Sequence, residues 1–283
     1  MNKNKKNIIT PYKTALKFAR THYENFPVVS FFIPKKMKKH VAIIYWFART
    51  ADDYADEGDL SDGERLEKLN DLEFRLKQLL NGKAESDFEL ALANTVNEKN
   101  LSPKYLYDLL KAFKQDVIKN RYSAFDEVLD YCKHSANPVG RLILELFDIR
   151  NEEANNYSDK ICTALQLTNF LQDVATDYQK GRIYLPQDEM EMFQITEKMF
   201  ELKENNLNLK KLLKLNVNRV DELFTDGKNL LKYLNGRLKF EIAWTIAGGE
   251  EILKQIKLND YDVLNKRPEL TKTKMINLLI KSI

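Results

Sequence analysis

The sequence predicts an all-α protein, and three observations support this. Apolar residues recur with helical spacing along almost the whole chain of 283 residues. Nine Gly and seven Pro are too few for the many turns of a β-protein of this length. A hydrophobic fraction of 43%, of which aromatic residues supply 11% of the chain, is enough for a sizeable core. Because no linker or composition shift interrupts the chain, we expect one domain over residues 11–283, preceded by a basic, disordered stretch over residues 1–10.

The first helix signals lie in the N-terminal third of the chain. Densely clustered apolar residues predict a helix over residues 36–57, which Gly58 ends. Ser61 and Glu64 have the spacing of a capping box, in which each side chain satisfies a backbone amide of the first turn. They predict an amphipathic helix that continues to about Leu80.

Further start and stop signals divide the rest of the chain. Ser102-Pro103 combines a capping hydroxyl with a proline at the first helical position. We expect a break at Asn137-Pro138, because proline removes a helical hydrogen bond, and an extended connection after Gly181. The helices predicted from these signals cover residues 103–119, 125–147, 158–180, 207–234 and 237–258, with Ser158 opening the third.

Composition excludes several classes of protein. The net charge of +3 is too balanced for a nucleic-acid-binding protein. Three His and two Cys without paired spacing predict neither a zinc site nor a disulfide framework. No apolar signal sequence follows the basic N-terminus, and the longest apolar run, residues 41–48, is too short to cross a bilayer. We therefore expect a cytoplasmic protein, and the Lys-rich N-terminus leaves open a peripheral contact with the membrane.

The first acidic cluster lies at the end of the helix predicted over residues 36–57. Asp52 and Asp56 are four residues apart and share one helix face, with Tyr45 and Arg49 on the preceding turns. Carboxylates that follow an apolar stretch are costly to bury unless a cation offsets their charge. An oxygen-only ligand set is typical of Mg²⁺. Taken alone, the cluster is better explained as a solvated helix end.

A second polar ladder follows in the helix predicted over residues 158–180. Asn169, Asp173 and Asp177 recur at every fourth position and place oxygen donors along one face. Downstream of the ladder stand two cations and a phenol that suit phosphate oxygens, Lys180, Arg182 and Tyr184. Two such ladders together predict several Mg²⁺ ions around a diphosphate, which the ions would turn into a leaving group. Taken alone, the ladder is equally consistent with ordinary polar residues on a solvent-exposed helix face.

Three other polar residues have weaker interpretations. His22 either contacts a phosphate or is an ordinary structural histidine. Asp53 and Glu57 lie about 100° around the helix from Asp52 and Asp56. We therefore expect them to contact the residues that bind the metal and not the metal itself.

Two stretches of the chain carry a resemblance to a known family, Ala48-Arg-Thr-Ala-Asp-Asp-Tyr-Ala-Asp-Glu-Gly58 and Asn169-Phe-Leu-Gln-Asp-Val-Ala-Thr-Asp-Tyr-Gln-Lys-Gly-Arg-Ile-Tyr-Leu-Pro186. With them, the sequence from about Tyr12 to Leu279 resembles the squalene/phytoene synthases, all-α isoprenoid synthases. The resemblance implies a single-domain helical bundle around a central cavity and a prenyl diphosphate substrate.

The resemblance also implies roles for individual residues. Asp52 and Asp56 match the first metal-binding motif of the family, and Asn169, Asp173 and Asp177 match the second. The four aspartates of these motifs are the implied catalytic residues. The positions at which the family contacts diphosphate or metal correspond here to Tyr45, Arg49, Gln166, Arg182 and Tyr184.

One bacterial branch of the family is especially similar. Gln172 stands where the commoner second motif has Arg, and the stretches His22–Pro27 and Ser135–Arg141 also resemble the hydroxysqualene synthases of hopanoid biosynthesis. This implies Mg²⁺-dependent ionisation of presqualene diphosphate, rearrangement of the cation and capture of water, without NADPH. Upstream and downstream enzymes of the squalene pathway are the implied partners.

Three alternatives remain open at this point. The same fold and metals would serve a synthase that condenses two prenyl diphosphates to presqualene diphosphate, squalene or phytoene. The chain would otherwise be a family member without catalytic activity that acts in assembly, or a helical interaction protein with acidic surfaces.

Overall fold

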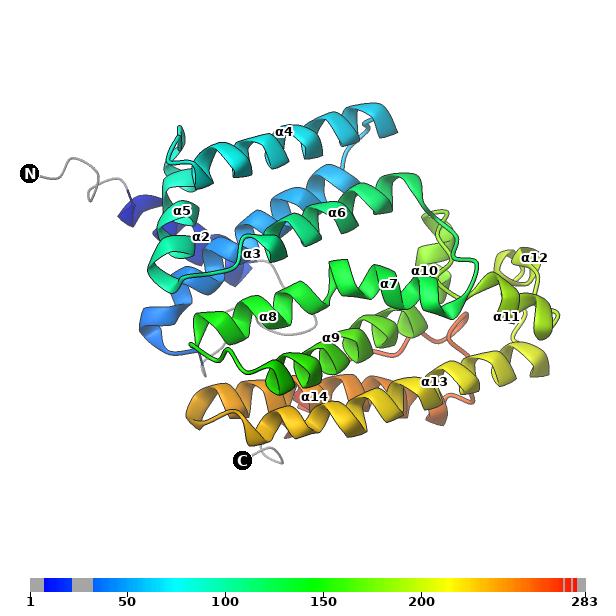
Figure 1. Cartoon of the computed structure of the whole chain (residues 1–283). Coiled ribbons are helices and arrows are strands. Elements are labelled where there is room, and N and C mark those ends of the chain that lie inside the picture. Colours follow the sequence, from blue (N-terminus) through cyan, green and yellow to red (C-terminus); the bar gives the residue numbers. More distant parts are fainter. Residues whose placement is uncertain (1–7, 22–32, 272, 276, 279–283) are drawn as a thin grey trace, which may run out of the picture. The chain divides into compact units, whose positions relative to one another are not determined.

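The computed structural model describes residues 8–21, 33–271, 273–275 and 277–278. All regular elements within these residues are helices and none is a strand, which confirms the predicted all-α fold (Figure 1). The helices are α2 (Ile9–Thr21), α3 (Lys35–Asp56), α4 (Asp62–Leu80), α5 (Asp87–Lys99), α6 (Lys104–Ile118), α7 (Phe125–Ser135), α8 (Asn137–Leu146), α9 (Glu152–Gln172), α10 (Val174–Gln179), α11 (Gln187–Met192), α12 (Glu197–Glu201), α13 (Leu207–Gly227), the 3₁₀ helix η1 (Lys228–Lys232) and α14 (Gly236–Leu258).

The chain folds into two compact units. Unit 1 comprises residues 1–118 and 138–152, and unit 2 comprises residues 119–137 and 153–283. The single domain expected over residues 11–283 stays a prediction. Helix α2 begins at Ile9, inside the stretch expected to be disordered, and residues 1–7 lie outside the described residues.

In unit 1, α3 packs against α2, α4, α5 and α6 (Figure 1). Its apolar residues explain this position, because Ile43 and Phe47 are almost completely buried. The capping box predicted at Ser61 and Glu64 is present, and α4 begins directly after Ser61. Unit 1 therefore surrounds the helix that carries the first acidic cluster.

Helix α5 was not predicted from the sequence. Ser86 and Glu89 form a second capping box at its start, with the same spacing as the first. The two carboxylate oxygens of Glu89 also bind Arg75 of α4, at 2.8 and 2.7 Å. The sequence therefore contains a local signal for the start of α5.

The structure confirms the break at Asn137-Pro138 and corrects one helix start. Helix α7 ends at Ser135 and α8 begins at Asn137, so proline occupies the first turn of α8, where its missing amide costs nothing. Helix α9 begins at Glu152, and Ser158 is buried inside it. The prediction that Ser158 opens this helix was therefore wrong, because a serine inside a helix gives the same local signal as a cap.

In unit 2, a small residue permits close packing of α14. A Cβ atom on Gly249 would lie 2.6 Å from the ring of Phe224 and 2.9 Å from Leu165. A larger residue at this position would therefore require Phe224 and Leu165 to shift, so glycine permits the present approach of α14 to α13 and α9. None of the helices in the described part of the chain has the length and apolar character needed to cross a membrane.

Candidate active site

Helix α3 carries the first acidic cluster on the face opposite its buried residues. Tyr45, Arg49, Asp52 and Asp56 follow one another at spacings of four, three and four residues, which puts them on one face. Phe47 on the opposite side has only 1% of its surface exposed. The core contacts of the buried face therefore fix the direction in which the polar face points.

Arg49 holds three carboxylates of this cluster. Its Nη1 lies 3.0 Å from Oδ2 of Asp52, its Nε lies 2.7 Å from Oδ1 of Asp53, and its Nη2 donates to Oε1 of Glu57 at 2.9 Å. The guanidinium is 24% exposed, so these pairs are screened less than pairs on an open surface. One cation thus offsets the repulsion among carboxylates that lie within two turns of helix.

The structure places Asp53 and Glu57 against Arg49. We expected both to contact the residues that bind the metal. Each contacts Arg49, which also binds Asp52. Tyr45 is half-buried, and its ring centroid lies 6.0 Å from that of Phe18 on α2.

The second cluster spans the junction of α9 and α10. Helix α9 ends at Gln172, and Asp173 has φ −107° and ψ 15°, outside helical geometry. The helical hydrogen bonds nevertheless continue across this bend: Asp173 N donates to Asn169 O at 2.9 Å, and Asp177 N donates to Asp173 O at 2.8 Å. The three ladder residues therefore keep nearly the register that the sequence predicted, although the helix itself is interrupted.

Arg267 forms a two-pronged ion pair with Asp173. Its Nε donates to Oδ1 at 2.5 Å and its Nη2 donates to Oδ2 at 3.2 Å. The neighbouring Gln172 is 1% exposed, and its Nε2 donates to the carbonyl oxygen of Pro268 at 2.7 Å. Asp173 of the ladder and its neighbour Gln172 thus bind two adjacent residues of the segment that follows α14.

Asp177, Arg182 and Tyr184 line one small cavity of unit 2. The cavity has a volume of about 20 Å³, roughly the room of one water molecule, and apolar side chains line most of it. The tight turn at Gly181, with φ +77°, brings the backbone amide of Arg182 to within 2.8 Å of Asp177 O. The structure therefore brings together three residues that the sequence assigned to one diphosphate site.

Tyr184 belongs to an aromatic group. Its ring stacks on Phe170 with a centroid distance of 3.6 Å and an angle of 6° between the planes. Tyr122 and Tyr131 lie beside it, at centroid distances of 5.6 and 6.0 Å. Aromatic rings thus pack around the phenol ring of Tyr184, which lines the same cavity as Arg182 and Asp177.

The remaining predicted residues occupy different environments. Asn169 is exposed and Gln166 is half-buried, both on α9. His22 lies outside the described residues. The described residues contain no group of three or more His, Cys, Asp or Glu side chains that could hold a metal ion on its own.

The donor chemistry of the two clusters fits Mg²⁺. The ligands are carboxylate and amide oxygens, as this ion prefers. Asp52 binds Arg49 and Asp173 binds Arg267, so each carboxylate already has a positive charge beside it. Asp52, Asp56, Asn169, Asp173 and Asp177 are the residues that could hold the ions.

The sequence reasoning missed Arg267 and the role of Gln172. Arg267 is 94 residues from Asp173, and no local pattern links the two. The only available signal was a single arginine before a proline, in a segment without helical periodicity. Gln172 was noted as a departure from the commoner motif, but its contact with Pro268 depends on the tertiary fold.

Comparisons with known proteins agree with this architecture. A family model described as squalene/phytoene synthase matches residues 19–274. A hydroxysqualene synthase of Rhodopseudomonas palustris is 35% identical over 251 residues, which cover 87% of this chain and 84% of that protein. A hydroxysqualene synthase of Sinorhizobium fredii is 33% identical over 242 residues, which cover 84% of this chain and 80% of that protein.

Solved structures show the same fold. The crystal structure of squalene synthase HpnC from Alicyclobacillus acidocaldarius has a TM-score of 0.84 and 33% identity, and the match covers 90% of this chain and 95% of that one. A dehydrosqualene synthase in complex with ligand has a TM-score of 0.87 at 21% identity, covering 98% of this chain and 96% of that one, and this likeness concerns the fold alone.

Proposed function

This chain belongs to the squalene/phytoene synthase family, and we propose that it converts presqualene diphosphate to hydroxysqualene in bacterial squalene and hopanoid biosynthesis. The observation that carries the proposal is the similarity to two relatives named hydroxysqualene synthase over more than four-fifths of the chain. Complete oxygen ladders at both acidic clusters support an active enzyme over an assembly protein.

The proposed reaction balances without a redox partner. The C–O bond to diphosphate breaks with both electrons leaving on oxygen, and the cyclopropylcarbinyl cation that remains rearranges. Water then adds to the rearranged cation, so one water is consumed and diphosphate and a proton are released. Because no hydride is required, NADPH is not expected as a cofactor.

Five side chains would hold the Mg²⁺ ions, with Asp52 and Asp56 from unit 1 and Asn169, Asp173 and Asp177 from unit 2. When bound, the ions would supply the charge that makes diphosphate a leaving group. Arg49 already fixes Asp52 at 3.0 Å, which would hold that carboxylate in place before the ligand arrives. Asp173 would exchange its pair with Arg267 for the metal.

The residues around the small cavity of unit 2 would act on the substrate itself. Arg182 would bind the diphosphate oxygens, and Tyr184 would donate a hydrogen bond to them. The stacked rings of Tyr184 and Phe170 would exclude water from the site. Further contacts with the diphosphate are proposed for Tyr45, Gln166 and His22.

Product analysis tests this function. Purified protein would be incubated with presqualene diphosphate and Mg²⁺ in the absence of NADPH, and the products extracted and identified by mass spectrometry. We expect hydroxysqualene with metal and none after addition of a chelator. Unchanged presqualene diphosphate under conditions in which the protein is folded would contradict the proposal.

Head-to-head condensation is the second candidate. It is favoured by the name of the solved relative from Alicyclobacillus acidocaldarius, which is called a squalene synthase. Incubation with farnesyl diphosphate alone separates the two, because condensation would release presqualene diphosphate and the main proposal predicts no product. The absence of product from both substrates would indicate a protein without catalytic activity.

We place the reaction in the cytoplasm, in contact with enzymes that supply presqualene diphosphate and consume hydroxysqualene. Both molecules are poorly soluble in water because of their long apolar chains, so transfer between neighbouring proteins or through a membrane would be efficient.

A further inference from the structure

The near-neutral net charge hides a strong separation of charge along the chain. The first 51 residues contain eleven Lys and Arg and a single acidic residue, Glu24. The remaining residues contain 34 Lys and Arg against 41 Asp and Glu. Such asymmetry between parts of one chain indicates a partner with a charged surface.

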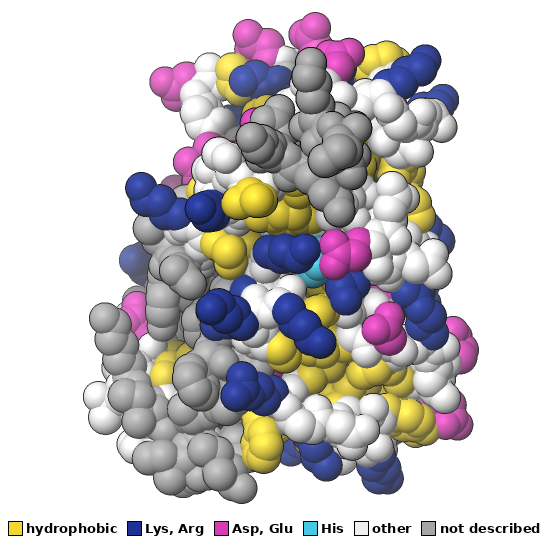
Figure 2. All heavy atoms as spheres, turned by 90° about the vertical axis from the view of Figure 1, so that its left-hand side faces the viewer, with side chains coloured by type: hydrophobic (Ala, Val, Ile, Leu, Met, Phe, Trp, Pro, Cys, Tyr) yellow, Lys and Arg dark blue, Asp and Glu magenta, His cyan; other side chains and the backbone are white. Residues whose placement is uncertain are grey.

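The fold gathers part of this charge at one end of unit 1. Lys13 lies on α2, and Lys35, Lys36 and Lys38 lie in the first turns of α3, which packs against α2. We call these four residues the lysine surface. Figure 2 looks onto the side on which α3 begins, and dark-blue Lys and Arg side chains gather there among yellow apolar ones.

The lysine surface lacks internal compensation. Lys13, Lys35 and Lys36 are exposed and Lys38 is half-exposed, and none of the four forms an ion pair with a described residue. Cations at the start of a helix are also unfavourable, because the helix dipole is positive there. Since this arrangement costs stability locally, an external anion is the simplest source of compensation.

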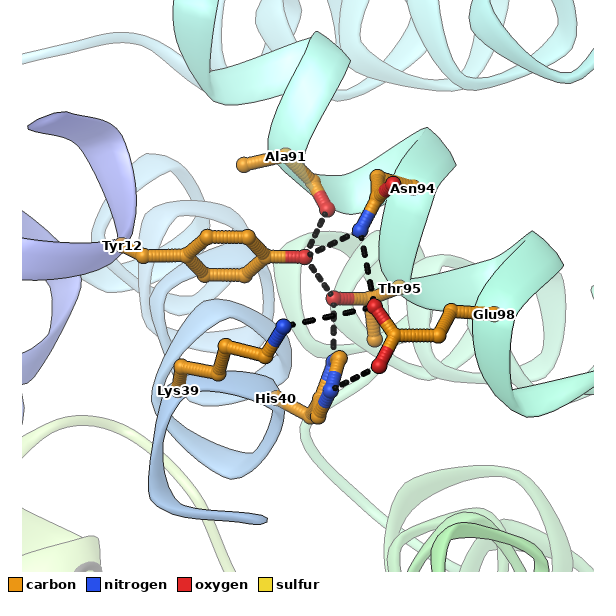
Figure 3. A network of polar contacts seen from close by, with 7 residues as sticks. All are labelled: Tyr12, Lys39, His40, Ala91, Asn94, Thr95 and Glu98. Carbon is orange, nitrogen blue, oxygen red and sulfur yellow. Dashed lines mark hydrogen bonds and ion pairs between the residues drawn. The ribbon is translucent and has the colours of Figure 1, made fainter. Parts of the chain in front are cut away.

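A buried polar network makes the base of the lysine surface rigid (Figure 3). His40 lies directly after the lysines on α3, and its ring nitrogens contact Thr95 Oγ1 at 2.9 Å and Glu98 Oε1 at 3.2 Å on α5. The hydroxyl of Tyr12 on α2 contacts the same Thr95 at 2.7 Å. Lys39 pairs with Glu98 at 3.3 Å, so this lysine, unlike its neighbours, is already neutralised.

The chemistry of the surface favours a lipid bilayer over a nucleic acid. All four cations are lysines, which act as hydrated point charges, whereas the planar fork of Arg is preferred for reading phosphates and bases. Ile9 on α2 has 57% of its surface exposed, which suits the boundary between headgroups and acyl chains. Asp52 lies at the other end of α3, about 24 Å from Lys36 along the axis at 1.5 Å per residue.

We propose that the lysine surface docks this protein on an anionic lipid bilayer, with Ile9 entering the headgroup region. Each lysine near such a surface strengthens binding by about fivefold, so four of them give a useful affinity only when the lipid is anionic. Asp52 and Asp56 lie at the opposite end of α3 from its three lysines of this surface. The proposal does not depend on the reaction proposed above.

Sedimentation with vesicles tests the proposal on the full chain. We expect binding to vesicles of phosphatidylcholine with about one-third phosphatidylglycerol at roughly 0.1 M salt, and none to pure phosphatidylcholine. Changing all four lysines of the surface to Gln should lower the partition coefficient at least tenfold. A matched variant, with exposed Lys198, Lys203, Lys211 and Lys214 of unit 2 changed to Gln, removes the same charge and should stay within twofold of wild type.

Two results would overturn it. One is failure of the wild-type protein to bind anionic vesicles at low salt, and the other is equal loss of binding in the matched variant. Ile9→Ser separates a bilayer from other polyanions, because it should weaken vesicle binding severalfold and leave retention on heparin unchanged. Circular dichroism confirms that each variant is folded, and Lys35→Gln with Lys36→Gln serves as a milder substitute, with an expected loss of at least fivefold.

Discussion

The two acidic clusters obtain their positive charge from different places in the chain. In unit 1, Arg49 belongs to the same helix as the carboxylates that it holds, Asp52, Asp53 and Glu57. In unit 2, Asp173 binds Arg267, which comes from a segment beyond α14. The first cluster is therefore complete once α3 forms, whereas the second requires the fold of the whole unit. Similar sets of ligands can therefore depend on local structure in one place and on tertiary structure in another.

Removing one carboxylate from each cluster should have the largest effect. We expect Asp52→Asn and Asp173→Asn each to lower turnover about 10³-fold, or ~4 kcal/mol in the barrier, because each removes charge from the metal and diphosphate site. The double variant should be no more than about tenfold slower than either single variant if, as proposed, the two clusters act on one leaving group. Steady-state kinetics at saturating Mg²⁺ provides the measurement.

Asp71→Asn on α4 serves as the matched control for this series. Asp71 is exposed, and its substitution should leave turnover within about twofold. Wild-type turnover in either cluster variant would remove that cluster from the active site, and the account would then retain the other cluster alone.

Acid should affect the helix of the first cluster more than that of the second. Burial lowers the pKa of His40 on α3 from 6.5 to about 4. As the pH falls from about 6.5 to about 4, the unfolded chain takes up a proton that the folded protein resists, so the free energy of unfolding should decrease by up to about 3 kcal/mol. Above pH 6.5 this group should have no effect on stability.

Hydrogen exchange and urea unfolding check this dependence. After correction for the slower intrinsic exchange at low pH, amides of α3 should be less protected at pH 4.5 than at pH 7, and the loss of protection should be larger than for amides of α9. His40→Gln should flatten the pH dependence of unfolding. If the free energy of unfolding changed equally with pH in wild type and variant, His40 would not be the group responsible for the acid sensitivity.

Replacing the arginine of the second cluster should change the affinity for Mg²⁺. Arg267 forms a bidentate ion pair with Asp173 and would have to release it before that carboxylate could bind a metal. Arg267→Gln should therefore tighten Mg²⁺ binding to the free protein about fivefold, or ~1 kcal/mol, which is the range of a partly exposed ion pair. Competition with Mn²⁺, followed by its magnetic resonance signal, measures the affinity; weaker binding in the variant would refute this exchange of partners.

The smallest effects should come from Asp53 and Glu57, the two partners of Arg49 that are not assigned to the metal. Asp53→Asn and Glu57→Gln are expected to change turnover less than about threefold, because Arg49 keeps its contact with Asp52 in both variants. Glu57 is 64% exposed, so its change should be the milder of the two. A loss comparable to that of Asp52→Asn would make either residue a metal ligand.

Local signals predicted much of the fold. The capping box at Ser61, the break at Asn137-Pro138 and the turn at Gly181 depend on interactions within a few residues, and the structure contains all three. The start of α9 was misplaced, because Ser158 resembles a cap when its burial is unknown.

The candidate site was predictable only in its local part. The spacing of Asn169, Asp173 and Asp177 survives in the structure because consecutive helical hydrogen bonds preserve it through the bend. The pairing of Asp173 with Arg267 was not predictable, since it requires α14 to pack and the following segment to return to α9. The stacking of Tyr184 on Phe170 likewise depends on the turn at Gly181.

Calorimetric titration of inorganic diphosphate into the protein tests whether both acidic clusters form one site. We expect one diphosphate bound per chain, only in the presence of Mg²⁺, with an affinity at least tenfold lower in both Asp52→Asn and Asp173→Asn. Binding that survives a chelator, or that is unchanged when either aspartate is replaced, would contradict the claim that both acidic clusters serve one magnesium-dependent diphosphate site.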